Sequence, residues 1–142
     1  MTSKYETHNS LKRSFEELET LDDLKGFALV RVDRLSGDAG DELRFWINDH
    51  QYLKMHHHQD CCESVTIKDI CGDLNDLLNS PILVAEERKN DYSETDDGDQ
   101  RWTFYHLATI KGSVDISWYG ESNGYYSTSV DTYYVDIQRE GM

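Results

Sequence analysis

Arg101-Trp-Thr-Phe-Tyr-His-Leu-Ala-Thr-Ile110 and Ser113-Val-Asp-Ile-Ser-Trp-Tyr119 are the two segments of the sequence that decide the fold. In the second segment, apolar and polar residues alternate strictly, which predicts a strand with one buried and one exposed face. The first segment has the composition of a strand as well. Lys111-Gly112 lies between them, where we expect a turn.

Further strands are expected on both sides of this pair. Leu43-Arg-Phe-Trp-Ile47 and Gln51-Tyr-Leu-Lys-Met55 flank the polar Asn48-Asp49-His50, which is the pattern of a β-hairpin with a short loop. The remaining strands are predicted to be short and apolar, at Phe27–Val32, at Ile82–Ala85 and through Tyr133, Tyr134 and Val135.

Two helices are expected in addition. Ser10 can cap a helix over residues 10–22, because apolar residues recur there every three or four positions. Thr66 can cap a second helix, since Asp69 follows three residues later and apolar residues continue at helical spacing as far as Ser80-Pro81.

Residues 90–100 differ from all of these segments. They contain almost no apolar residue, and their acidic residues are Asp91, Glu94, Asp96, Asp97 and Asp99. We therefore expect a solvated, flexible acidic loop. A length of 142 residues is the usual size of one domain. The sequence thus predicts a single α+β domain over residues 1–142, with one mainly antiparallel, strongly curled sheet and about two helices.

The charge of the chain restricts its partners. There are 28 Asp and Glu against 14 Lys and Arg, a formal net charge of −14. Such a charge repels nucleic acid phosphates and anionic membranes, so direct binding to either is not expected. It is compatible with plain solubility, with attraction to a basic partner, or with imitation of a phosphate backbone. No signal peptide or membrane span is evident, and the three cysteines do not form the even-numbered set of a secreted disulfide framework. We therefore expect the protein to reside in a reducing cytoplasm.

Several short pieces occur in a fixed order between residues 26 and 130. They are His56-His-His-Gln-Asp-Cys-Cys-Glu-Ser-Val65, Asp69-Ile-Cys-Gly-Asp-Leu74, Ser80-Pro-Ile-Leu83, Ala85-Glu-Glu87, Trp102-Thr-Phe-Tyr105, Leu107-Ala-Thr-Ile-Lys-Gly112 and Trp118-Tyr-Gly-Glu-Ser-Asn-Gly-Tyr-Tyr-Ser127. Together they resemble a family of small uncharacterised acidic proteins found mostly in bacteriophage genomes. The resemblance brings no established activity. It implies a phage protein in the cytoplasm of a bacterial host, acting on host machinery or on defence systems.

The run His56–Glu63 concentrates groups that can bind metals. Its imidazoles, thiols and carboxylates would suit Zn²⁺ or another transition metal. The candidate ligands are His56, His58, Asp60, Cys61, Cys62 and Glu63. On an extended strand His56 and His58 would point the same way. The paired spacing of structural zinc sites is missing, so a packed strand end with a buried cysteine is the alternative interpretation.

Aromatic residues near the C-terminus form a second candidate site. Asn123-Gly124 is a strong hairpin signal, because both residues tolerate positive φ, and it predicts a turn between Trp118-Tyr119 and Tyr125-Tyr126. Exposed Tyr and Trp are good contact residues, although aromatic pairs that only stabilise a sheet are the alternative. The candidate binding residues are Trp118, Tyr119, Asn123, Tyr125 and Tyr126, together with the loop acids Asp96, Asp97 and Asp99.

The sequence therefore favours a binding protein over an enzyme. It contains none of the Walker, dinucleotide-binding, zincin or serine hydrolase motifs. The leading hypothesis is a phage accessory protein that binds a host protein, blocking a nucleic-acid-handling or defence enzyme. One alternative is a metal- or small-molecule-binding domain that uses His56–Glu63. Another is an enzyme with Cys62 or Asp60 at its centre, since neighbouring imidazoles can activate a thiol.

Overall fold

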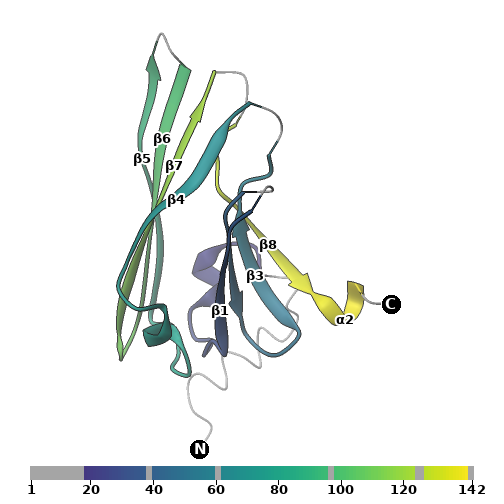
Figure 1. The fold of residues 1–142 in the computed structure, drawn as a ribbon. Helices are drawn as coiled ribbons and strands as arrows, with labels where there is room; N and C mark the ends of the chain where they lie inside the picture. The colour runs from purple at the N-terminus through teal and green to yellow at the C-terminus, as the bar shows by residue number, and fades with distance from the viewer. Residues whose placement is uncertain (1–17, 38–39, 60–61, 96–97, 124–126, 141–142) are drawn as a thin grey trace, which may run out of the picture.

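The chain forms a two-layer β-sandwich, which corrects the predicted α+β fold with one strongly curled sheet (Figure 1). The computed structural model describes residues 18–37, 40–59, 62–95, 98–123 and 127–140. Within these ranges the helices are single short turns, at η2 (Leu21–Leu24), η3 (Leu74–Leu77) and α2 (Ile137–Glu140). The described part of the fold is therefore built from strands and not from the two long helices expected from apolar spacing.

Both sheets contain four antiparallel strands. The first sheet has the order β1-β2-β3-β8, with β1 (Arg31–Leu35), β2 (Glu42–Trp46), β3 (Gln51–His56) and β8 (Asp131–Asp136). The second sheet has the order β4-β7-β6-β5, with β4 (Ser64–Cys71), β7 (Gly112–Ser122), β6 (Gly98–Thr109) and β5 (Val84–Thr95). The predicted hairpin of β2 and β3 and the strand pair of β6 and β7 are confirmed.

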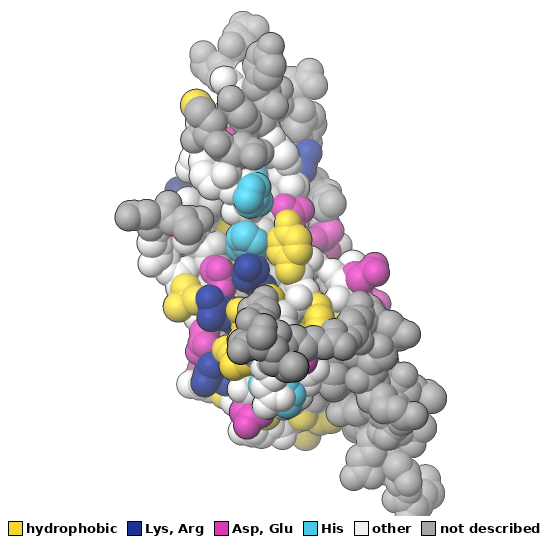
Figure 2. Space-filling view, turned by 90° about the vertical axis from the view of Figure 1, so that its right-hand side faces the viewer, with side chains coloured by type: hydrophobic (Ala, Val, Ile, Leu, Met, Phe, Trp, Pro, Cys, Tyr) yellow, Lys and Arg dark blue, Asp and Glu magenta, His cyan; other side chains and the backbone are white. Residues whose placement is uncertain are grey.

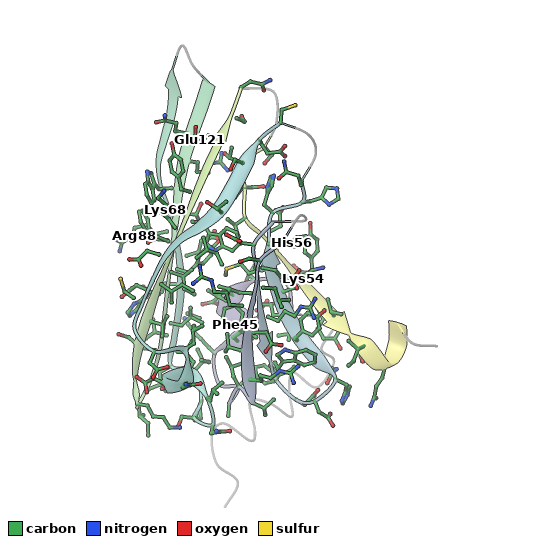
Figure 3. All side chains as sticks on the ribbon, in the orientation of Figure 1. Phe45, Lys54, His56, Lys68, Arg88 and Glu121 are labelled. Atoms are coloured by element: carbon green, nitrogen blue, oxygen red, sulfur yellow. The ribbon has the colours of Figure 1, made fainter. Side chains whose placement is uncertain are left out.

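The alternation in the sequence places one face of each sheet in a shared core. In the second sheet Ile116 pairs with Tyr105 and Val114 with Leu107, and all four side chains are at most 1% exposed. In the first sheet the inward residues include Leu43, Phe45, Leu53 and Met55, which are fully buried. Phe45 lies between the sheets in Figure 3. Burying each such side chain stabilises the fold by roughly 1.5–3 kcal/mol.

The helix expected from Thr66 to Ser80 is wrong, because the segment begins as strand β4. Val65 and Ile67 are buried while Thr66 and Lys68 are exposed, which is the two-residue period of a strand. An irregularity between Ile67 and Asp69 then shifts the register, so that Ile70 pairs with Ile116 on the core side. Pairing with β7 therefore overrides the helical spacing of the apolar residues.

The acidic segment 90–100, which the composition predicts to be a loop, is mostly strand in its described residues. Its backbone continues β5 as far as Thr95, and β6 resumes at Gly98, so most of the segment belongs to a hairpin. Ladder hydrogen bonds come from the backbone and do not require apolar side chains. Asp96 and Asp97 lie outside the described residues.

Two further predictions concern segments near the ends of the chain. The turn predicted at Asn123-Gly124, with Tyr125-Tyr126 after it, lies partly outside the described residues; β7 ends at Ser122, and the later strand β8 pairs with β3 in the first sheet. The predicted strand Phe27–Val32 begins only at Arg31, and Phe27 and Leu29 instead fill the core. The predicted helix 10–22 lies mostly outside the described residues, and its last residues belong to η2.

Candidate binding face

The outer face of the second sheet carries side chains of β5, β6 and β7 in three cross-strand rows. Residues directly opposite each other on antiparallel strands share one face. The register therefore places Glu86, His106 and Asp115 in a first row, Arg88, Phe104 and Ser117 in a second, and Trp102 with Tyr119 in a third. In Figure 3 Arg88 points away from the first sheet. We call these eight residues the open face.

A hollow of about 650 Å³ lies against this sheet. Its volume is in the range of small-ligand sites. Six of its nine lining residues belong to the first two rows of the open face. The lining consists of Glu86, Glu87, Arg88, Phe104, Tyr105, His106, Asp115, Ile116 and Ser117. The hollow is thus built on regular strands, which hold their side chains in fixed positions.

Three half-buried rings of the open face contact one another. The rings of Trp102 and Phe104 are nearly parallel, at 4° and 6.0 Å between centroids, because both residues point from the same side of β6. The Trp102 and Tyr119 rings are 4.8 Å apart at 51°. Among the described residues, no Lys or Arg lies over any of these rings. The rings therefore present an apolar platform to the outside.

The open face is acidic, and its histidine is paired at the surface. His106 Nδ1 and Asp115 Oδ1 are 2.7 Å apart, with the two side chains 40% and 61% exposed. Partial burial, followed by the nearby Glu121 carboxylate, raises the pKa of Tyr119 above its ordinary value. The eight residues of the open face include two acids, Glu86 and Asp115, and one base, Arg88. The whole segment 64–122, which contains the second sheet, carries twelve Asp and Glu against five Lys and Arg, and this excess favours positively charged ligands.

The outer face of the first sheet is built from similar side chains but is closed. The guanidinium of Arg31 lies 4.2 Å from the Trp46 ring centroid, and that of Arg44 lies 5.0 Å from the Tyr52 ring. Trp46 Nε1 also donates a 2.9 Å hydrogen bond to Asp33. Figure 2 shows this face, with Lys and Arg side chains set among hydrophobic and acidic ones. We call it the closed face, because Trp46 and Tyr52 are only 4% and 5% exposed.

The run His56–Glu63 is spread over different surroundings. His56 lies on the closed face, 5.2 Å from the Tyr133 ring, while His58 is exposed. Burial, followed by the charge of Lys54, lowers the pKa of His56. Cys62 is disulfide-bonded, so its sulfur is not the thiolate ligand or nucleophile that the sequence suggested. No group of three potential metal ligands occurs among the described residues, which leave out Asp60 and Cys61.

His57, which the ligand hypothesis passed over, makes the tightest contacts of this run. Its Nδ1 lies 2.7 Å from the backbone oxygen of Ser129, and its Nε2 lies 2.8 Å from Glu63 Oε2. A carbonyl oxygen only accepts, so Nδ1 is the donor to Ser129. The two side chains are 4% and 0% exposed. His57 thus ties the end of β3 both to Glu63, just before β4, and to Ser129 in the segment before β8.

The free thiol of Cys71 is a poor candidate nucleophile. Its Sγ donates a 3.0 Å hydrogen bond to Asp69 Oδ2. That hydrogen bond and the charge of Asp69 raise the pKa of the Cys71 thiol, which disfavours the reactive thiolate. Among the described residues, Cys71 is the one free cysteine.

The predicted aromatic site is divided by the fold. Trp118 is buried in the core at 1% exposure, whereas Tyr119 lies on the open face and Asn123 is exposed beyond β7. Tyr125 and Tyr126 lie outside the described residues, and Asp99 is placed in β6 by its backbone alone. Trp102, Phe104 and His106 were not predicted as a site from the sequence. Their spacing of two along a strand was the signal that could have grouped them.

Comparison with known proteins gives a family but no activity. Residues 11–132 match the Domain of unknown function DUF7448. The chain belongs to this family. No curated protein and no solved structure matches it. In the part of this DUF7448 domain that the structure describes, no helix combines the length and the apolar character that crossing a membrane requires.

Proposed function

We propose that this DUF7448 protein is a non-catalytic binding protein that docks a partner protein on the open face. The observation that carries the proposal is the hollow lined by Phe104, together with the adjacent Trp102 ring, because no cation of the described residues lies over either ring. Aromatic side chains supply much of the binding energy at protein interfaces, because they bury large areas at low entropic cost. A sheet face is also a rigid support for them.

The charge of the chain supports a basic partner. A net charge of −14 speeds encounter with positively charged surfaces and disfavours nucleic acid itself. The broader proposal is a bacteriophage accessory protein that binds a host protein in the bacterial cytoplasm and occupies the basic surface of a nucleic-acid-handling or defence enzyme. The acidic hairpin of β5 and β6 extends the same sheet and would add to this attraction.

Comparative affinity purification from bacterial cells tests this function. The bait proteins are the wild type, Phe104→Ala on the open face and Tyr133→Ala on the closed face as a matched aromatic control. We expect a specific partner, identified by mass spectrometry, to be captured by the wild type and by Tyr133→Ala and to be lost with Phe104→Ala. Equal capture of that partner by all three proteins would remove the open face from the interaction.

A further inference from the structure

The closed face shows how this chain completes an aromatic surface. Each ring of Trp46, Tyr52 and Tyr133 has a cation of the same chain at 4.2, 5.0 or 5.8 Å from its centroid. Such cations are attracted by the electron-rich face of the ring. The rings of the open face have no cation of the described residues over them. The space over the ring, which a cation of the same chain occupies on the first sheet, is therefore available to a ligand on the second sheet.

Carboxylates lie beside this position. Glu86 and Asp115 occupy the first row of the open face, and Phe104 occupies the second. Residues two apart on a strand are separated by about 7 Å, so a side chain lying on Phe104 reaches the first row. Asp115 uses Oδ1 for His106, which leaves its second oxygen to accept another hydrogen bond. Glu86 and Asp115 therefore lie on either side of His106, in the row next to Phe104.

We infer that the hollow binds an arginine side chain of an extended basic segment in the partner, an inference that rests on the proposed function. The guanidinium stacks on Phe104 and donates hydrogen bonds to Glu86 and Asp115. The neighbouring residues of the segment pack on Trp102 and Tyr119 in the third row. Arginine is favoured over lysine because its planar guanidinium both stacks on rings and pairs with carboxylates.

Substitution of Arg88 tests the inference, because the inference predicts the direction in which the affinity for a basic segment changes. The exposed guanidinium of Arg88 lies in the second row beside Phe104 and repels an incoming cation. Arg88→Gln should therefore bind the basic segment about threefold more tightly, as expected for removing one exposed like charge. A site for an anionic or neutral ligand predicts the opposite effect or none.

Fluorescence polarisation with labelled five-residue peptides measures the binding. The peptides place arginine, lysine or citrulline at alternate positions, and citrulline keeps the shape of arginine without its charge. The protein variants are Phe104→Ala, Asp115→Asn and Arg88→Gln. Asp49→Asn is the matched control, because Asp49 is also an exposed acid bonded to a neighbouring histidine, with Oδ1 2.8 Å from His50 Nδ1.

The expected order of affinity is arginine above lysine above citrulline. Phe104→Ala should weaken arginine peptide binding about tenfold and Asp115→Asn about threefold, while Asp49→Asn leaves it within error. Equal losses with Asp115→Asn and Asp49→Asn would mean that the peptide senses only net charge, and would overturn the inference. Equal affinity for the citrulline peptide would overturn it as well.

The inference and the proposed function fail separately. If the arginine peptide does not bind while Phe104→Ala still abolishes capture of the partner protein, the open face is a docking surface for another ligand class. If the partner is captured equally by Phe104→Ala, the proposed function fails whatever the peptides do. Circular dichroism of each variant confirms that it is folded before binding is compared.

Discussion

The outer faces of the two sheets contain the same kinds of residues and differ in what covers them. On the closed face, Arg31 and Arg44 lie over Trp46 and Tyr52, which are almost fully buried. On the open face, Trp102, Phe104 and Tyr119 are half-buried and contact one another. Aromatic content alone therefore does not mark a binding surface. A cation of the same chain lies over the closed-face rings, including the exposed Tyr133, whereas none of the described residues places a cation over the open-face rings.

The histidine–carboxylate pairs repeat this difference. His57 and Glu63 are buried at 4% and 0% side-chain exposure, whereas His106 and Asp115 are exposed at 40% and 61%. Removing one partner of a buried pair leaves the other desolvated and uncompensated. Removing one partner of a surface pair costs little, because water replaces it. The same pair of chemical groups thus stabilises the fold in one place and remains available for binding in the other.

The largest effect is expected for His57→Ala. It should lower the free energy of unfolding by about 3 kcal/mol, because the buried Glu63 then loses its hydrogen bond to the imidazole. His106→Ala should lower it by at most about 0.5 kcal/mol. Urea denaturation of both variants measures the two values. Similar losses would show that burial does not separate the pairs.

The next effect concerns the tryptophans. Trp46→Ala should cost about 3 kcal/mol, because it removes a buried ring together with the hydrogen bond to Asp33. Trp102→Ala should cost roughly 1 kcal/mol, since that ring is half-exposed. Thermal and urea unfolding report both values. A larger loss with Trp102→Ala would show that the open face is a structural surface.

The covering cations should contribute a smaller amount. Arg31→Ala removes the guanidinium over Trp46 and should cost about 1 kcal/mol. Arg88→Ala removes a guanidinium of the open face that lies over none of its rings, and should change stability by less than about 0.5 kcal/mol. The urea midpoints of the two variants can be compared directly. An equal cost for both would contradict the distinction between the faces.

The smallest effect is a pH dependence on the closed face. Burial and Lys54 hold the pKa of His56 below its usual value of 6.5, while Glu42 and Asp131 oppose this shift. The unfolded chain therefore binds this proton first as pH falls, so stability is full above about 6.5 and declines below it. His56→Gln should reduce the loss between pH 7 and pH 5. The unfolding free energies of the wild type and of His56→Gln are also compared at pH 8, where His56 is neutral in the folded and the unfolded state. Any difference at this pH reports the effect of the substitution apart from the proton.

The sequence predicted the β-rich segments where alternation was strict and local. Val114, Ile116 and Trp118 alternate with polar residues and form β7, and the hairpin of β2 and β3 follows from its short polar loop. The segment after Thr66 could not be predicted, because its apolar residues fit both periods and pairing with β7 decides between them. Such long-range pairing cannot be derived from the propensities of one segment. The acidic segment was missed for another reason: its local hairpin is held by backbone pairing of β5 with β6 and does not need apolar side chains.

The candidate site was less predictable than the fold. Tyr119 belongs to the open face, as expected of an exposed aromatic, but its neighbour Trp118 points into the core. The rows of the open face depend on the register between three strands, which no single segment encodes. His57 could have been separated from His56 and His58 by strand alternation, since it points to the opposite side. Its partner Glu63 lies beyond the strand and becomes evident only from the fold.

The central claim, that a cationic ligand binds the open face and not the closed face, is tested most directly by mapping where such a ligand binds. Titration of isotope-labelled protein with the arginine peptide, followed by two-dimensional amide NMR, reports every backbone position at once. The account predicts concentration-dependent shifts at Glu86, Phe104 and Asp115 on the second sheet, and unchanged signals at Arg44 and Lys54 on the first. Shifts confined to the first sheet, or scattered evenly over the acidic residues of both, would contradict it.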